Sequence, residues 1–322
     1  MSAWQLLIAA LAAASALVAP LAVAAPDVYF ASVAVEGGPA ESHSSPTGTS
    51  ANLSFSNGLL AGQAFAGGTL GTYTTASSFG VTGDLVGTSR SWSIRSEAAM
   101  VGNALITGTG NSVSVPMAMF LDGSLQVLLS ANPNGGEVGW YNAYTRIIID
   151  IYVDPVSSPA YRAGHASREV SVGQFLASPP QDGRASEGFL QNAAWSSSFG
   201  RDTISSLVLT DALSLPVNDA FDLQINLTSF SQIAVMNPFL GPNLNTIAVA
   251  ISDFSHTLGF IADTPILAMP AGYNFNAPSI GIVDNLCTGS LCVTSPAPEP
   301  SMQLMLFAGL SLIIAVARYR RT

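Results

Sequence analysis

The sequence predicts an all-β protein, an antiparallel β-sandwich of jelly-roll type, on two observations. First, short runs that alternate apolar and polar residues recur through the middle of the 322-residue chain, and turn-forming residues separate them. Second, no long apolar stripe with the 3.6-residue period of a helix occurs between the two termini. Many short strands joined by hairpin turns are typical of two packed antiparallel sheets.

The clearest strand is TRIIIDIYVD at 145–154, where apolar side chains fall on one face and charged ones on the other. Its predicted inward residues are Ile147, Ile149, Ile151 and Val153. The run 221–228 repeats the pattern with Phe221, Leu223, Ile225 and Leu227. Two further strands are predicted around Trp92 and Ile94, and around Ile247, Val249 and Ile251. Turns are expected at 81–84, 121–124 and 132–137.

Three other segments complete the prediction of the body. The Ser-, Gly- and Pro-rich stretch Glu36–Gly48 is expected to be a loop or a flexible arm. Residues 186–197 are expected to form one or two helical turns, weakened by glycine and serines. A break within 154–169 divides the body either into two sheets or into two domains, and the sequence leaves that choice open.

The composition excludes one class of partner. Charged residues make up only 9% of the chain, against about 25% in an ordinary globular protein, and there is no lysine. Between residues 25 and 298 lie nineteen acidic residues and seven arginines, which gives a net charge near −12. Such a surface repels a polyanion, so we expect no nucleic-acid binding.

The N-terminus has the layout of a secretory signal peptide at 1–24. An apolar, Ala-rich segment from Leu6 to Val18 is followed by Pro20 and by the small residues Ala22-Val23-Ala24, a cleavage site of the A-x-A type. The alternative is an uncleaved membrane anchor, because the apolar character continues to Ala25.

The C-terminus predicts a transmembrane helix. Ser301–Ala317 has no charged residue and would rise about 26 Å as a helix at ~1.5 Å per residue, close to the ~30 Å hydrocarbon core of a membrane. Arg318, Arg320 and Arg321 follow at once, and such a cluster stays on the cytoplasmic side. The body of the protein is thereby expected outside. The alternative is a buried core helix at the end of the domain.

The order Pro298-Glu299-Pro300, hydrophobic helix and Arg-rich tail resembles the PEP-CTERM sorting signal of Gram-negative bacteria. The resemblance covers about the last 27 residues. It implies that an exosortase-type membrane peptidase recognises the tripeptide, which the helix holds at the membrane surface. The physical reading agrees, because two prolines keep the segment extended and open to a peptidase. We divide the chain into a signal peptide at 1–24, an exported β-sandwich domain at 25–293 and a sorting signal at 294–322.

The chain has two cysteines, Cys287 and Cys292. In an exported protein such a pair is expected to form a disulfide, whose short loop gives at most the low end of the usual ~2–4 kcal/mol of stabilisation. The alternative is a metal site, which needs two more ligands, and no histidine is close in sequence.

No catalytic motif is present. The nucleophile elbow Gly-x-Ser-x-Gly does not occur. Serines are so abundant that one near His43, His165 or His256 in the fold is expected by chance. His256 has Asp253 nearby, but three residues apart on a strand they project to opposite faces. Asp150 and Asp154 share a strand face about 13 Å apart, beyond the ~5–9.5 Å of glycoside hydrolases. We expect no enzyme, no cofactor and no metal site. Acidic pairs that remain open as calcium ligands are Asp219 with Asp222 and Asp202 with Asp211.

Three aromatic residues suggest a non-catalytic role. Trp140, Tyr141 and Tyr144 stand beside Asn142 and Arg146, and aromatic faces next to amides are how many sandwiches hold sugars. The alternative places Trp140 in the core and the tyrosines at the start of a strand. The sequence therefore favours an exported protein of the cell surface or exopolysaccharide matrix with a structural or adhesive role. The second hypothesis is a carbohydrate-binding module, and the third is a secreted hydrolase.

Overall fold

A computed structural model of the chain describes residues 28–35, 40–45, 49–56, 60–69, 72–83, 89–132, 140–175, 179–236, 245–288 and 292–293. The expected signal peptide, the tripeptide Pro298-Glu299-Pro300, the C-terminal helix and Arg318, Arg320 and Arg321 all lie outside these residues. None of the helices among the described residues is both long and apolar enough to cross a membrane.

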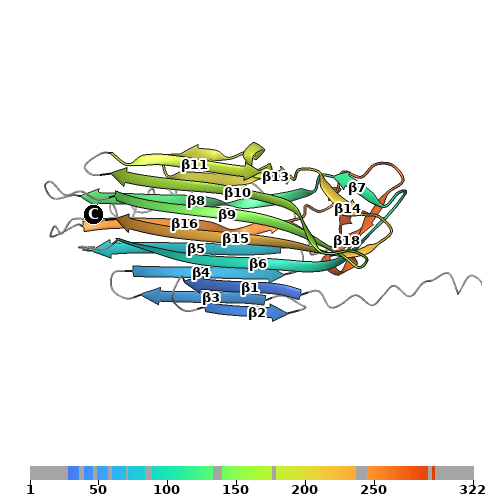
Figure 1. Ribbon diagram of the computed structural model, residues 1–322, viewed down its shortest axis with the longest axis horizontal. Helices are drawn as coiled ribbons and strands as arrows, with labels where there is room; N and C mark the ends of the chain where they lie inside the picture. The colour runs from blue at the N-terminus through green and yellow to red at the C-terminus, as the bar shows by residue number, and fades with distance from the viewer. Residues whose placement is uncertain are drawn as a thin grey trace, which may run out of the picture.

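Two large antiparallel sheets make up the body, and their strands run along the long axis (Figure 1). Sheet A has the order β11–β10–β9–β15–β6–β1–β2, and β17 pairs with the end of β6. The bounds of its strands are β1 Val28–Val35, β2 Ala40–Ser45, β6 Ser89–Thr107, β9 Trp140–Pro155, β10 Tyr161–Phe175, β11 Gln181–Gly188, β15 Ala220–Met236 and β17 Asn274–Asn276.

Sheet B has the order β12–β13–β8–β16–β5–β4–β3. Its bounds are β3 Thr49–Ser56, β4 Leu60–Thr69, β5 Thr72–Gly83, β8 Ala118–Asn132, β12 Ser196–Ser198, β13 Arg201–Leu209 and β16 Asn245–Gly259. Two short pairs gather at one end of the body: β7 Ser112–Val115 with β14 Leu213–Pro216, and β18 Ile282–Val283 with β19 Leu286–Cys287 (Figure 1). The 3-10 helices are η1 Phe189–Asn192 and η2 Pro278–Ile280. The predicted all-β antiparallel class is confirmed.

One hydrophobic core fills the space between the two sheets. The alternation predicted for 145–154 and 221–228 is confirmed, because all eight predicted inward side chains are buried. These strands are β9 and β15, which pair along their whole length in the middle of sheet A. Strands with one buried face therefore supply the core, and their other face forms the outer surface of sheet A.

Three predictions of local structure need correction, and a fourth is confirmed in part. On β16 the phase is opposite to the prediction: Ala250, Ser252 and Phe254 are buried, while Val249 and Ile251 are only half-buried. Residues 121–124 form no turn and lie inside β8. Part of the expected loop at 36–48 is a strand, β2, which pairs with β1. Within 186–197, the expected helical turn is present as η1, although β11 continues to residue 188 before it.

The break expected within 154–169 is a hairpin. It joins β9 to β10, which pair along their length in sheet A, with a bulge between Arg162 and Gly164. The chain therefore returns to the same sheet at this point.

The end of the body is closed by a disulfide and by backbone contacts. Cys287 and Cys292 are joined with Cα atoms 5.7 Å apart. Next to Cys292, the amide of Val293 donates to the carbonyl oxygen of Phe260 over 2.8 Å. Nearby, the side chain of Asn285 accepts from the amide of Leu267 over 2.9 Å and donates to its carbonyl over 2.7 Å, as a paired strand would.

Candidate functional site

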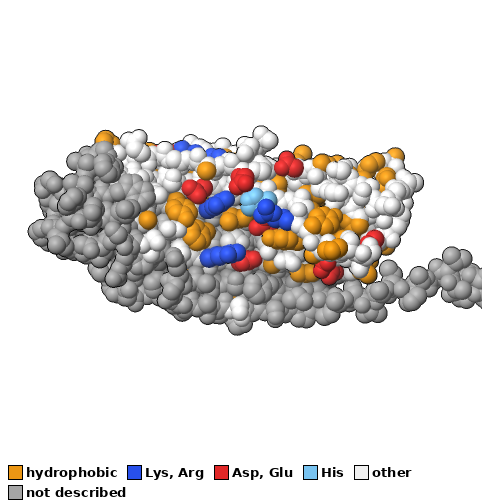
Figure 2. Space-filling view, in the orientation of Figure 1, with side chains coloured by type: hydrophobic (Ala, Val, Ile, Leu, Met, Phe, Trp, Pro, Cys, Tyr) orange, Lys and Arg blue, Asp and Glu red, His pale blue; other side chains and the backbone are white. Residues whose placement is uncertain are grey.

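The outer face of sheet A gathers charged side chains in its middle (Figure 2). Because alternate residues of β9 point into the core, Arg146, Asp150, Tyr152 and Asp154 share the outward face. Neighbouring strands add outward Arg95 and other polar residues. The described part of this face holds a surface depression and, next to it, a cluster of ion pairs.

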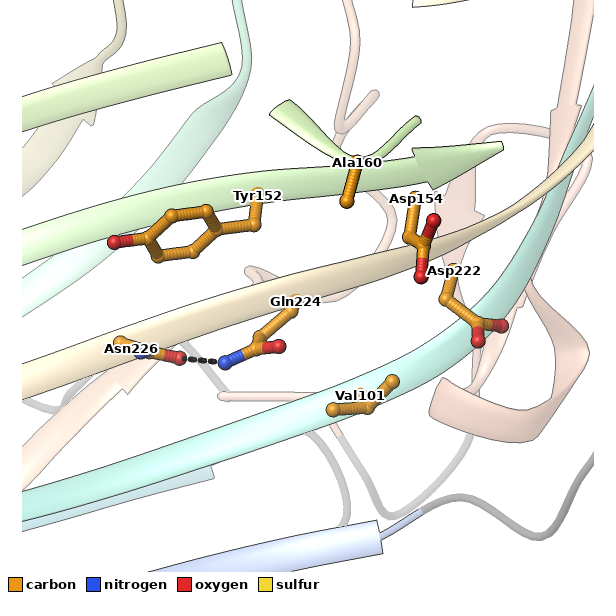
Figure 3. Close-up of a pocket in the computed structure, with 7 residues that line it drawn as sticks. All are labelled: Val101, Tyr152, Asp154, Ala160, Asp222, Gln224 and Asn226. Carbon is orange, nitrogen blue, oxygen red and sulfur yellow. Dashed lines mark hydrogen bonds between the residues drawn. The ribbon is translucent and has the colours of Figure 1, made fainter. Parts of the chain in front are cut away.

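The depression has a volume of about 370 Å³ and opens to solvent (Figure 3). Three central strands and the hairpin after β9 line it. Its lining residues are Val101 from β6, Tyr152 and Asp154 from β9, Ala160 from the hairpin, and Asp222, Gln224 and Asn226 from β15. The lining therefore combines one aromatic ring and two small apolar side chains with carboxylates and amides.

The antiparallel register brings these residues together. Asp222 of β15 stands directly opposite Asp154 of β9, and Gln224 stands opposite Tyr152. On the other side, Gln224 stands opposite Val101 of β6. Directly opposite residues on one face have Cβ atoms about 4.5–5.5 Å apart, so the two rows form one continuous floor.

A chain of hydrogen bonds fixes the two amide side chains of the depression. Gln224 Nε2 donates to Asn226 Oδ1 over 2.8 Å, and Asn226 Nδ2 donates to Glu97 Oε1 over 3.2 Å. The guanidinium of Arg95 in turn donates to Glu97 over 2.8 Å. Both amides are thus oriented before any ligand arrives. The carbonyl oxygen Oε1 of Gln224 keeps its acceptor capacity for the depression.

The two carboxylates of the depression lie next to each other without an arginine between them. Asp222 accepts a hydrogen bond from Asn103 Nδ2 over 3.3 Å. Asp154 is exposed, and none of the described arginines forms an ion pair with either carboxylate. Like charges directly opposite on a sheet are unfavourable, so a donor-rich ligand would relieve this pair.

Beside the depression, His165 of β10 lies between two carboxylates. Its Nδ1 is 2.6 Å from Asp150 Oδ1 and its Nε2 is 3.7 Å from Glu187 Oε2. Arg162 also contacts Asp150, over 3.4 Å. Gly188 lets the end of β11 lie close to the backbone of His165. It has φ of 61°, and a Cβ there would collide with the carbonyl oxygen of His165. The cluster has a histidine with two acids, yet it lies on an open sheet surface.

Glu169 lies further along the same face, opposite Arg146. Partial burial raises the pKa of the Glu169 carboxyl, and the nearby charge of Arg146 opposes that rise. Arg146 itself donates to the hydroxyl of Ser167 over 2.8 Å. The hydroxyl of Ser167 therefore accepts a hydrogen bond from a guanidinium group.

The predicted sugar-binding aromatics lie elsewhere on β9. Tyr144 is half-buried: its hydroxyl donates to Gln232 Oε1 over 2.6 Å and its ring packs 5.6 Å from that of Phe230. The side chains of Trp140 and Tyr141 lie outside the described residues, as do those of His43 and His256. The aromatic ring of the depression belongs instead to Tyr152, which the sequence places on the wet face of the strand without singling it out.

A second ionic cluster lies inside the body. The carboxylate of Asp202 on β13 is fully buried and accepts from Arg168 of β10 over 2.7 Å and from Arg184 of β11 over 2.8 Å. The hydrogen bond to Asp202 is the main cause that raises the pKa of Arg184. Arg168 also lies 5.4 Å from the ring centroid of Trp195.

This cluster argues against one predicted pair of calcium ligands, Asp202 with Asp211. Asp202 bonds to two arginines, and Asp211 is exposed. Of the other open pair, Asp219 accepts from Ser157 and Asp222 from Asn103. In the described ranges, no group of three or more His, Cys, Asp or Glu residues could hold a metal ion.

Comparisons with known proteins add nothing to this geometry, because no family model, curated protein or solved structure matches the chain.

Proposed function

We propose that the chain is an exported protein of the bacterial cell surface or exopolysaccharide matrix, with a structural or adhesive role. The observation that carries the proposal is the order of the C-terminal parts: Pro298-Glu299-Pro300, an uncharged apolar segment and three arginines. The joined cysteines add support, because disulfides persist in oxidising compartments outside the cytoplasm. An exosortase-type membrane peptidase is the partner that this order implies.

We further infer that the sandwich is of jelly-roll type. Four central strands of sheet B have the order β5–β16–β8–β13, and four of sheet A have the order β6–β15–β9–β10. Along the chain, the connections from β5 to β6, from β6 to β8 and from β8 to β9 each pass from one sheet to the other. A hairpin then joins β9 to β10 within sheet A. The connections from β13 to β15 and from β15 to β16 pass between the sheets again. This alternation of hairpin and crossing supports two interlocked Greek keys.

A structural or adhesive role is favoured over catalysis by the character of the outer face. The His165 cluster lies on an open sheet with no described nucleophile against the imidazole. Catalytic groups normally act in a site that excludes water. The aromatic group Trp140, Tyr141 and Tyr144 stays the prediction of the second hypothesis, a carbohydrate-binding module.

The test separates the three parts of the sorting signal in a host that carries an exosortase. Glu299→Ala removes the charge of the tripeptide and should leave uncut precursor in the membrane. Leu310→Arg costs about 2.5–3.5 kcal/mol near the bilayer centre and should weaken membrane retention. Replacing the three terminal arginines by serine should let the tail slip across the membrane.

The measurement is an immunoblot of membrane and medium fractions, with Thr294→Ala, four residues before the tripeptide, as the matched control. The control should be cut and released like the wild type. If the Glu299→Ala protein is also cut and released like the wild type, the tripeptide is no recognition element and the sorting proposal fails. Cysteine labelling that finds the body in the cytoplasm would contradict the proposed topology.

A further inference from the structure

The depression on sheet A offers acceptors and an aromatic ring to a ligand. Asp154, Asp222 and the free oxygen of Gln224 accept hydrogen bonds, and the two carboxylates carry negative charge that no described arginine pairs. Tyr152 and Ala160 border these acceptors on one side, and Val101 does so on the other (Figure 3). The matching ligand therefore carries several donors close together on a small ring or chain that also has an apolar face.

A sugar residue has this combination. Its hydroxyl groups donate to carboxylates and amides, and its C–H groups pack against an aromatic ring or small apolar side chains. The volume of about 370 Å³ falls in the range of ordinary ligand pockets, which begins at roughly 300 Å³. An open depression also admits one residue of a long polymer, which a closed pocket does not.

The charge of the depression narrows the class of sugar. A uronic acid or a sulfated sugar would bring a third negative charge next to Asp154 and Asp222, whose carboxylates are already close to each other. Repulsion at such short range opposes binding. Neutral sugars and amino sugars meet no such barrier.

We propose that the depression between β6, β9, β15 and the hairpin after β9 binds a neutral or amino-sugar residue of a glycan. Gln224 and Asn226 are held in place by the hydrogen-bond chain to Glu97 and Arg95, so the site is oriented before binding. The inference rests on the proposed adhesive role only in one respect: that role places the protein where it meets a glycan. Binding itself is a property of the folded body.

The experiment applies the full chain to an array of neutral, amino-sugar, uronic and sulfated oligosaccharides, in a detergent without a sugar head group. The strongest glycan is then titrated by calorimetry with and without EDTA. Asp222→Asn keeps the shape of the floor and removes one charged acceptor. Ala160→Trp fills the depression from an exposed position. Asp122→Asn on β8 of sheet B is the matched charge control.

We expect a neutral or amino-sugar glycan to bind. Its affinity should be about tenfold weaker in Asp222→Asn, since a hydrogen bond to a charged group is worth about that factor. Ala160→Trp should weaken binding by a similar factor, because the new side chain fills the depression. Asp122→Asn should bind within about twofold of the wild type, and EDTA should change nothing.

Four results would overturn the proposal: no glycan bound, a preference for uronic or sulfated glycans, unchanged affinity in both depression variants, or a strict need for calcium. The last result would mean that the carboxylates hold a cation. This test is independent of the export proposal. A chain that binds no sugar can still be processed at Glu299, and a chain that is not processed can still bind sugar once purified.

Discussion

Two carboxylates of this protein, Asp202 and Asp150, each lie between two basic side chains, but at different depths. Asp202 has no exposed surface and bonds to Arg168 and Arg184, whose side chains are 13% and 27% exposed. Asp150 is 19% exposed, and its partner Arg162 is 53% exposed. Two clusters of similar residues therefore differ in their surroundings. The inner cluster joins strands of both sheets, and the outer cluster leaves its charges in contact with water.

Depth decides what each cluster contributes to stability. Exposed ion pairs gain about 0–1 kcal/mol, because water screens them and long side chains lose freedom. Removal of one partner from a buried cluster costs about 3–5 kcal/mol, since an uncompensated charge stays inside. We therefore expect the inner cluster to hold β10 and β11 against β13, and the outer cluster to be replaceable.

The largest expected effect comes from Asp202→Asn. The amide keeps the shape of the side chain but leaves Arg168 without its counter-charge, while Arg184 keeps only its ion pair with Asp182. The free energy of unfolding should fall by about 3 kcal/mol, the low end of the range for buried pairs, because both arginines retain some exposure to water. Urea unfolding followed by circular dichroism measures it. A loss below about 1 kcal/mol would mean that the inner cluster behaves like a surface one.

The matching change in the outer cluster is Asp150→Asn. It removes the carboxylate that contacts Arg162 and the nearer of the two that contact His165, on a face where water can replace it. We expect the free energy of unfolding to change by less than about 1 kcal/mol. The same urea titration in 1 M NaCl should shrink this small difference further, because the screening length falls to about 3 Å. An effect as large as that of Asp202→Asn would erase the distinction between the clusters.

The smallest effect concerns Glu169, a half-exposed carboxylate whose pKa is raised by burial. Because the folded state binds this proton more tightly than the unfolded state, the contribution of Glu169 to stability is greatest at low pH and is lost as pH rises through the raised pKa. Glu169→Gln should therefore stabilise the protein slightly at pH 7, by less than about 1 kcal/mol.

The check on Glu169 is a series of thermal unfolding curves between pH 4 and pH 7. The advantage of the glutamine variant should shrink as pH falls toward the ordinary value of 4.5, where the unfolded carboxyl also takes up its proton. An advantage that grows toward low pH would reverse the sign and show that the attraction of Arg146 outweighs burial.

Alternation in the sequence predicted the fold best where one face is strongly apolar. In β9 and β15 the inward positions are Ile, Val, Leu or Phe, so the phase was unambiguous and proved correct. In β16 it failed, because the buried positions include small Ala250 and Ser252 while larger Val249 and Ile251 lie half-buried on the other face. Residue type alone therefore gives the wrong phase where the inward side chains are small or polar and the outward ones are larger and apolar.

The candidate site depended on information that local patterns lack. Asp154 and Asp222 are 68 positions apart in the sequence, and only the register of β9 with β15 sets them side by side. The inner cluster did leave a signal. Asp202 has the same strand phase as buried Ile204 and Val208, and Arg168 has the phase of buried Val170. Charged residues at inward-facing positions of two strands indicate a buried ion pair.

The closure next to Val293 has a mechanical consequence for a tethered protein. Tension applied through the C-terminal tail first reaches the bridge in which Val293 runs parallel to Ile261, with hydrogen bonds to Phe260 and Ala262. Behind the bridge, the covalent link from Cys292 to Cys287 passes the force to β19. In the proposed tethered state, tension from beyond Val293 would therefore enter the body at this bridge and at the disulfide.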